Sequence, residues 1–490
     1  MSEGNGEKMR QLIELAVACG RKRQSEQSGL VHLYYSTTQE DHKSIPIVEN
    51  VLFALALMRT KTVENIQEAK SILDRTLHFQ NTSEGVSVGN FPIYLHDYPV
   101  CKDRLLGAHL VTPFAWILRH FSQVLGAALK AKLEGAARML IQHLLQPLQN
   151  PYHLEVKIAA GALALGEWFG EAALADEGRR RLNAIESQPD WAVWCAPESV
   201  SEILPALQLV YSSLASSPWQ PLWDYLCASW HSQALTYKGP GWREYQWGFE
   251  PQAVLSDLYL GYACEAFSKR SLVDHSYHLQ AALIQPFAEQ MVDSRKQLHG
   301  SIGDSAWAMD VRGALSIACM KKGTSVNPAY EHAFHPFKMV WGSADQSRSF
   351  VCQGGRVAAF DYHLLPAGPI ELIFDLETTP PPEEREKSRE VSFFLDAGAE
   401  ARFLVEGVPA TTFKLGDEVK IETGGTAFRL RWDLVEGEGI FMGHLMRSNR
   451  PSQKHLEGPL RFQSYDWQIF LRTIKRSDNC RIKATLVIDE

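Results

Sequence analysis

The hydrophobic period of this chain changes once, near Asn327, and that change limits the folds open to it. Before this residue, apolar side chains recur at i, i+3, i+4 and i+7, which is the period of an amphipathic helix. After it, apolar and polar residues alternate, which is the period of a half-buried strand. The sequence therefore predicts a helical part followed by a separate sheet part.

The first part is expected to hold about a dozen helices. Their predicted ranges are 7–22, 46–59, 62–79, 104–126, 129–146, 152–169, 171–187, 199–216, 219–235, 251–268, 274–294 and 304–322. Proline and glycine mark the breaks, as at Asn150-Pro151 and Gly239-Pro240-Gly241. The number and hairpin-like succession of these helices favour an (α/α) toroid over residues 1–330.

The second part reads as strands and turns. Predicted strands include residues 350–352, 357–360, 370–374, 391–395 and 428–432, and turns such as Gly354-Gly355 and Gly424-Gly425 separate them. About ten short strands with no helix between them are typical of an antiparallel β-sandwich, which we expect over residues 331–490. The predicted fold class is therefore a multidomain α+β chain, toroid first and sandwich second.

Composition narrows the possible partners. The chain has 490 residues, a formal net charge of −8 and a pI near 6.1, which argues against nucleic acid or an anionic membrane as the main partner. The N-terminus is polar and acidic, and no apolar run approaches the roughly 18 residues of a membrane span. The eight cysteines lack paired CxxC spacing and read as buried free thiols, so we expect a cytoplasmic location. No nucleotide, serine-hydrolase or zinc motif is present, and neither cofactor nor metal is expected.

Two loop-like segments, residues 89–98 and 239–248, carry the best functional signal. They supply the candidate ligand contacts Asn90, His96, Asp97, Trp242, Arg243, Glu244, Tyr245 and Trp247. Aromatic faces stack on sugar rings, and the guanidinium of Arg243 has the fork geometry that suits a carboxylate. We expect both loops on one rim of the toroid, facing the sandwich. The alternatives are that the tryptophans plug the toroid mouth, that Asn90 only makes a turn, and that His96 and Asp97 only share a local hydrogen bond.

The order of toroid then sandwich resembles the polysaccharide lyases of the heparinase II/III-like and chondroitin/alginate lyase type. The rhythm of residues 423–430, 437–444 and 447–451 is also similar to the sandwich domains of heparinase II/III-like proteins. Trp230-His231 followed by Tyr237-Lys238-Gly239 is similar to the histidine and tyrosine that precede a Gly-rich turn in chondroitin-type lyases.

This resemblance implies roles for four residues. In those lyases an Asn or Arg neutralises the uronate carboxylate, a Tyr or His removes the C5 proton, and a Tyr protonates the leaving oxygen. Here Asn90 and Arg243 match the first role, and His231 and Tyr237 match the proton-transfer roles. A histidine at the end of a helix also commonly caps it, so a structural role for His231 stays open.

Three functions follow as hypotheses. The first is a lyase that cleaves acidic, uronate-containing oligosaccharides or polysaccharides by β-elimination. The second is a toroid glycoside hydrolase, whose carboxylate pair would come from Asp97, Glu244, Asp304 and Asp310. The third is a non-catalytic carbohydrate-binding protein on the same fold.

Overall fold

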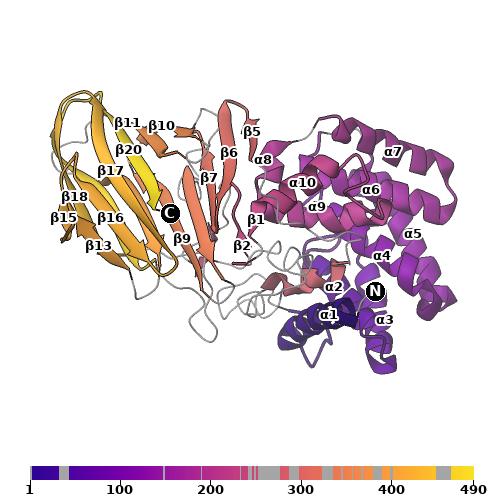
Figure 1. The fold of residues 1–490 in the computed structure, drawn as a ribbon. Coiled ribbons are helices and arrows are strands. Elements are labelled where there is room, and N and C mark those ends of the chain that lie inside the picture. Colours follow the sequence, from indigo (N-terminus) through magenta and orange to yellow (C-terminus); the bar gives the residue numbers. More distant parts are fainter. Residues whose placement is uncertain are drawn as a thin grey trace.

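The helical part and the sheet part lie side by side in a computed structural model of the chain (Figure 1). The structure describes residues 3–32, 44–146, 149–188, 190–231, 233–234, 236–240, 246–247, 250–251, 276–285, 297–322, 335–343, 346–355, 357–365, 368–378, 389–397, 401–448 and 465–489.

Helices α1 to α10 form the first part. Their bounds are α1 Glu3–Arg23, α2 Ile47–Arg59, α3 Val63–Leu77, α4 Ala108–Leu125, α5 Ala127–Leu144, α6 Tyr152–Phe169, α7 Ala172–Glu186, α8 Trp191–Trp194, α9 Pro197–Val210 and α10 Gln220–Ser229. The 3-10 helices η1 Leu95–Asp97 and η3 Ser276–Leu283 accompany them. A helix overlaps each of nine predicted ranges, from 7–22 to 219–235, although a short strand at Trp230–His231 follows the helix in the last of them. Residues 252–268 of the next range lie outside the described residues, and the described part of the range 274–294 forms η3.

Hydrophobicity separates inner from outer helices. α2 and α6 are buried nearly all round, as expected of helices inside a core. α3 and α7 each bury a narrower stripe against them. Each inner helix pairs with the next helix along the chain, α2 with α3, α4 with α5 and α6 with α7. Residues near the start of each inner helix line one cavity, namely Val48 of α2, His109 of α4 and Lys157 of α6, so α2, α4 and α6 begin at the same end of the toroid.

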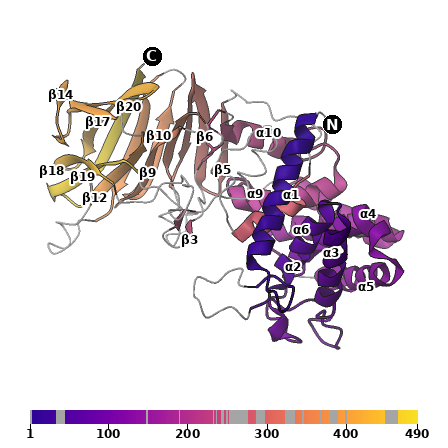
Figure 2. The ribbon, with the colours of Figure 1, turned by 90° about the horizontal axis from the view of Figure 1, so that it is seen from below.

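The ring closes through η3, which packs on α1, α2 and α4 (Figure 2). The guanidinium of Arg59 donates to the carbonyl oxygen of Ile284 at 2.8 Å, and Gln208 Nε2 donates to that of Gln285 at 3.2 Å. Glycine permits the closest approaches within the ring: a Cβ on Gly178 would lie 2.4 Å from the backbone nitrogen of Leu163. The predicted toroid is confirmed.

Two antiparallel sheets form the second part. The nine-stranded sheet has the order β15-β18-β19-β12-β9-β8-β7-β6-β5, and the seven-stranded sheet has the order β10-β11-β20-β17-β16-β13-β14. The strands of the first sheet are β5 Leu298–Ile302, β6 Ser305–Arg312, β7 Leu315–Met320, β8 Phe337–Gly342, β9 Ser347–Gly355, β12 Arg389–Asp396, β15 Thr412–Phe413, β18 Gly439–Arg447 and β19 Trp467–Arg476. Those of the second are β10 Val357–Leu364, β11 Ile370–Leu376, β13 Arg402–Val405, β14 Val408–Pro409, β16 Glu418–Thr423, β17 Thr426–Glu436 and β20 Arg481–Asp489.

Aromatic side chains from both sheets fill the sandwich core. Phe350 of β9 stacks on Phe393 of β12 with ring centroids 5.1 Å apart, and Phe428 of β17 lies 4.9 Å from Phe350. Along β11, buried and half-buried residues alternate without interruption, as a strand with one core face requires. All five predicted strand ranges lie within β9, β10, β11, β12 and β17, and the antiparallel sandwich is confirmed.

The predicted helix over residues 304–322 is wrong, because β6 and β7 form a hairpin there. Gly313 turns the chain with a φ of +60°. Every residue of β7 is buried, so this strand lacks the alternation that identifies a half-buried strand. The sheet consequently starts at Leu298 rather than after residue 330, and we propose a domain boundary just before β5.

A small apolar cluster joins the two parts. Tyr225 and Ala228 of α10 and Cys195 pack against Trp307 and Met309 of β6, together with other residues of β5 and β7. Trp191 of α8 adds its ring, whose centroid lies 5.1 Å from that of Trp307.

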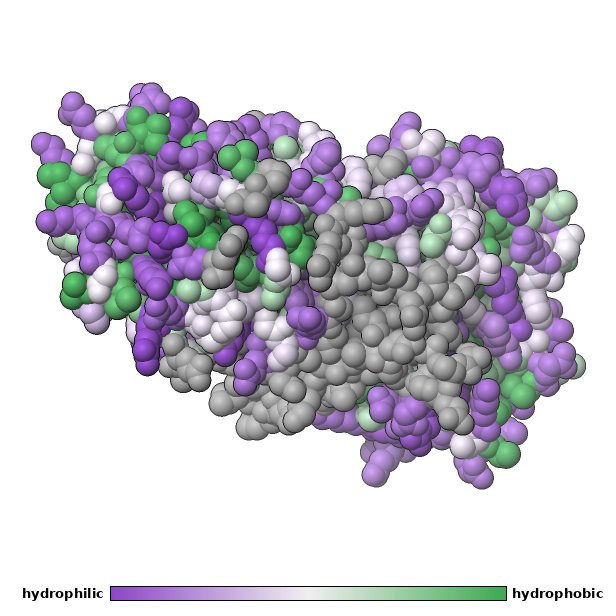
Figure 3. Space-filling model, in the orientation of Figure 1, coloured by the Kyte–Doolittle hydropathy of each residue, from purple (hydrophilic) through white to green (hydrophobic). Residues whose placement is uncertain are grey.

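Hydrophilic side chains cover most of the coloured surface in Figure 3, and apolar residues appear there in separate small groups. In the described part of the chain, none of the helices has the length and apolar character that a membrane crossing needs. No disulfide bond joins the seven cysteines described there, and six of them are buried.

Candidate functional site

A two-residue hairpin holds His231 and Tyr237 beside the junction of the two parts. Strand β1 (Trp230–His231) continues directly from α10 and pairs with β2 (Thr236–Tyr237). Nδ1 of His231 accepts from the backbone N–H of Ala234 at 3.1 Å, so Nε2 carries the proton and donates to the carbonyl oxygen of Ala314 at 3.2 Å. His231 therefore connects the hairpin to the β6–β7 turn as a neutral imidazole.

The hydroxyl of Tyr237 lies in a buried hydrogen-bond chain. It donates to the carbonyl oxygen of Pro240 at 3.0 Å, and the hydroxyl of Tyr225 lies 2.7 Å away. Burial raises the pKa of Tyr225 well above its usual range. Nζ of Lys338, from β8, lies 5.3 Å from the centroid of the Tyr237 ring. A proton donor, a second hydroxyl and a cation thus converge from both parts of the molecule.

Asn90 is fully buried in the loop before α4. Its Nδ2 donates to the carbonyl oxygens of Asp103 and Arg104 at 2.9 and 3.2 Å, and its Oδ1 has no partner among the described residues. Its backbone also pairs with Asn81. In this position Asn90 organises the loop that leads into α4, and its convergence with His231 and Tyr237 stays a prediction.

His96 and Asp97 lie in η1, on the same loop. The ring of exposed His96 stacks on Tyr94 with centroids 5.5 Å apart. The carboxylate of Asp97 accepts from Nζ of Lys102 at 2.8 Å, and this hydrogen bond lowers the pKa of Asp97. A lowered pKa is the opposite of what a general acid requires.

The second candidate loop falls largely outside the described residues, which exclude Trp242, Arg243, Glu244 and Tyr245. The backbone of Trp247 pairs with that of Glu250 across the β3–β4 hairpin (Gln246–Trp247 and Glu250–Pro251). The shared rim of the two loops therefore stays a prediction.

The remaining carboxylates of the hydrolase hypothesis belong to the sheet. Asp304 is exposed in the tight turn between β5 and β6, where Gly303 has a φ of +57°. Asp310 of β6 accepts from Arg312 Nε at 3.0 Å. Strand β6 begins directly after Asp304, at Ser305.

A polar cluster that the sequence analysis missed lies among the inner helices. Nζ of Lys157, from α6, lies 2.8 Å from Glu202 Oε2 of α9 and 2.9 Å from His109 Nδ1 of α4. A cavity of about 30 Å³ adjoins the cluster, and Thr112 contributes a buried hydroxyl without a partner in the described residues. Lys157 offered a sequence signal, because it is the only charged residue between Val156 and Gly166.

Interactions within this cluster determine the protonation states of Glu202 and His109. Burial alone would raise the pKa of Glu202, but the charges of Lys157 and His109 lower it to about 2. The charge of Lys157, helped by burial, lowers the pKa of His109 to about 4. At neutral pH the cluster therefore holds the carboxylate of Glu202 and the neutral imidazole of His109 on either side of Lys157. Within the described chain, no three His, Cys, Asp or Glu side chains gather as a potential metal site.

Acidification from about pH 7 to about pH 4.5 is expected to destabilise the fold through His109. Its folded-state pKa of about 4 lies below the ordinary 6.5, so the unfolded chain binds the proton more strongly and stability falls as pH drops below 6.5. Because the side chain is 35% exposed, solvent screening limits the loss to about 1 kcal/mol. Urea denaturation at both pH values should show a smaller loss for His109→Gln than for the parent protein. An equal loss in both proteins contradicts this assignment.

The sequence matches no protein-family model, and no curated protein matches it. Solved structures that are similar in fold include two polysaccharide lyases. A xanthan lyase from Paenibacillus matches with a TM-score of 0.56 at 9% identity, covering 100% of this chain and 57% of that one. A chondroitin AC lyase from Streptomyces coelicolor A3, in complex with chondroitin sulphate, matches with a TM-score of 0.51 at 10% identity, covering 99% of this chain and 83% of that one. This chain thus spans little more than half of the xanthan lyase. It has the fold of the polysaccharide lyases in which an α-toroid precedes an antiparallel β-sandwich.

Proposed function

We propose that the protein is a lyase that cleaves uronate-containing glycans by β-elimination. The observation that carries this proposal is the likeness of the whole chain, both parts in the same order, to two lyases named for acidic polysaccharides. Fold alone does not fix chemistry. The residue types near the junction of the two parts supply the second support.

The proposed reaction needs three catalytic functions from the protein. The uronate carboxylate must be neutralised so that the C5 proton becomes acidic, a base must remove that proton, and an acid must protonate the leaving oxygen. We assign neutralisation of the uronate carboxylate to Arg243 and the two proton transfers to Tyr237. We propose His231 as a positioning residue for the hairpin that carries Tyr237, because its Nδ1 accepts from Ala234 and its Nε2 donates to Ala314.

The described geometry changes the role that we propose for Asn90. Its side chain is fully buried, and its Nδ2 is occupied by two loop carbonyls. We therefore propose Asn90 as a positioning residue that shapes the loop carrying His96 and Asp97. Those two residues, with Trp242, Glu244, Tyr245 and Trp247, remain proposed substrate contacts.

No specific observation favours the hydrolase alternative. Such an enzyme needs one carboxyl group with a raised pKa. Asp97 has a lowered pKa beside Lys102, and Asp310 is hydrogen-bonded to Arg312. A non-catalytic carbohydrate-binding protein is the remaining alternative.

The test of the function is an assay on chondroitin sulphate and xanthan as separate substrates. Elimination leaves an unsaturated uronate that absorbs in the ultraviolet, and hydrolysis leaves none. We expect ultraviolet absorbance to rise in step with new reducing ends. Reducing ends without absorbance identify a hydrolase, and binding without either signal identifies a binding protein.

Arg243→Ala should weaken binding of uronate oligosaccharides about tenfold to a hundredfold, since hydrogen bonds to a charged group contribute about 1.5–3 kcal/mol. Binding of the carboxyl-reduced oligosaccharides should change little. Calorimetric titration of both ligands measures the difference, and Arg179→Ala on the outer helix α7 is the matched control. Equal losses for both ligands would remove Arg243 from carboxylate recognition.

A further inference from the structure

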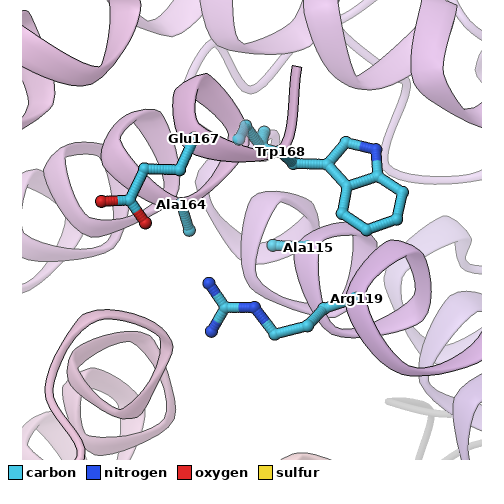
Figure 4. A pocket seen from close by; sticks show the side chains of 6 residues that line it. Ala115, Arg119, Ala164, Glu167 and Trp168 are labelled. Carbon is cyan, nitrogen blue, oxygen red and sulfur yellow. The ribbon is translucent and has the colours of Figure 1, made fainter. Parts of the chain in front are cut away.

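A larger cavity opens at the other end of the inner helices. Its volume is about 220 Å³, and it lies between α4 and α6 near their C-terminal ends (Figure 4). The lining residues are Ala115, Arg119, Ala164, Leu165, Glu167 and Trp168. Arg119 is ten residues beyond His109 on α4, roughly 15 Å along the helix axis at 1.5 Å per residue. The cavity is therefore separate from the cluster of Lys157, Glu202 and His109.

The cavity presents a fixed donor. NH1 of Arg119 donates to the carbonyl oxygen of Leu209 at 2.7 Å, at the end of α9. This bond holds the guanidinium at the cavity, and its other N–H groups have no hydrogen bond to described residues. Arg119 therefore offers oriented donors to a ligand at little cost in side-chain entropy.

An aromatic wall and an acceptor accompany this donor. Nε1 of half-buried Trp168 donates to Glu134 at 3.1 Å, and Nζ of Lys130 lies 5.5 Å from the indole ring, so the orientation of the ring is fixed. Glu167 is exposed, and its carboxylate lies 3.5 Å from Arg179. Figure 4 shows Glu167 and Trp168 on opposite sides of the cavity, with Arg119 reaching it from α4.

We infer that this cavity binds one neutral hexopyranose unit of a glycan. The volume lies below the roughly 300–1,000 Å³ of sites for drug-sized ligands, which suits a single ring. Trp168 provides a flat apolar face, and Arg119 and Glu167 provide a donor and an acceptor for neighbouring hydroxyls. Nζ of Lys130 lies 3.9 Å from Glu134, and Arg179 lies 3.5 Å from Glu167. The carboxylate of Glu167 and the C-terminal ends of α4 and α6 disfavour an anion, so a neutral sugar is the expected ligand.

The test is ligand-observed NMR with the methyl glycosides of glucose, galactose and mannose, and with glucuronate. At least one neutral glycoside should bind the parent protein, and glucuronate should bind more weakly. Trp168→Leu and Arg119→Ala should each weaken the neutral glycoside at least tenfold. Arg119→Lys is the conservative variant in case Arg119→Ala does not fold, because it retains a cation that can reach Leu209. It should also weaken binding, because lysine lacks the paired N–H donors of the guanidinium. Arg180→Gln, which lies on α7 outside the cavity and pairs with Glu177, should bind as the parent does.

Three results overturn the inference: no neutral glycoside binds, glucuronate binds more tightly, or Trp168→Leu and Arg119→Lys bind like the parent. Melting temperatures within a few degrees of the parent confirm that each variant is folded. Binding at this cavity requires no catalysis, so the result of the NMR measurement is independent of the result of the lyase assay. Both cavity variants should retain turnover on short substrates if the lyase proposal holds.

Discussion

Tyr237→Phe is expected to lower turnover about 10²–10⁴-fold while leaving the affinity for substrate nearly unchanged, because a proton-transfer group acts in the transition state. The phenyl ring preserves the packing of Tyr237, which is 6% exposed, and removes only the hydroxyl. The measurement is kcat and the dissociation constant on the same uronate substrate. Full turnover in this variant removes Tyr237 from the mechanism.

Tyr225→Phe is the matched control. Both variants lose the 2.7 Å contact between the two hydroxyls, and only Tyr237→Phe loses the proposed proton donor. We expect Tyr225→Phe to retain turnover within about tenfold, since one neutral hydrogen bond contributes about 0.5–1.5 kcal/mol. Equal losses in the two variants would indicate that the pair only supports the junction.

Lys157→Met is expected to lower the free energy of unfolding by about 3 kcal/mol, because it leaves the carboxylate of Glu202 among the inner helices without its cation. The side chain of Glu202 is 24% exposed, so water replaces the lost partner only in part. Urea denaturation at neutral pH measures the change. Addition of Glu202→Gln should restore more than half of the loss, since it removes the unpaired charge.

Lys420→Met provides the surface comparison for this pair. Nζ of Lys420 lies at the same 2.8 Å from Glu422, but the two side chains are 36% and 37% exposed. Exposed pairs contribute about 0–1 kcal/mol, so this variant should retain nearly all stability. A loss as large as that of Lys157→Met would show that burial does not decide the cost.

The fold was largely predictable because burial leaves a period in the sequence. The stripe of Ala137, Leu140, Ile141 and Leu144 is buried in α5, and the alternation of residues 370–374 is that of β11. A fully buried strand was not predictable, because it shows no alternation of apolar and polar residues. β7 is buried throughout, so its residues resembled a helix segment.

The candidate site was less predictable, because it depends on contacts between distant residues. The sequence pointed to Tyr237 but not to Tyr225 or Lys338, which reach it from α10 and β8. It also gave no sign that Asn90 is buried in its own loop, since an asparagine beside glycine and proline suits an exposed turn equally well. Lys157 was identifiable as an isolated charge in an apolar helix, but its partners were not.

Whether water is incorporated during cleavage is the most direct test of β-elimination by this protein. Chondroitin sulphate and xanthan should each be digested in H₂¹⁸O, and the products should be weighed by mass spectrometry. β-Elimination adds no water to the cleaved bond, so we expect fragments whose masses sum to that of the substrate, with no ¹⁸O from cleavage. Fragments heavier by one water, with ¹⁸O at the new reducing end beyond that of an exchange control, would contradict it and establish hydrolysis.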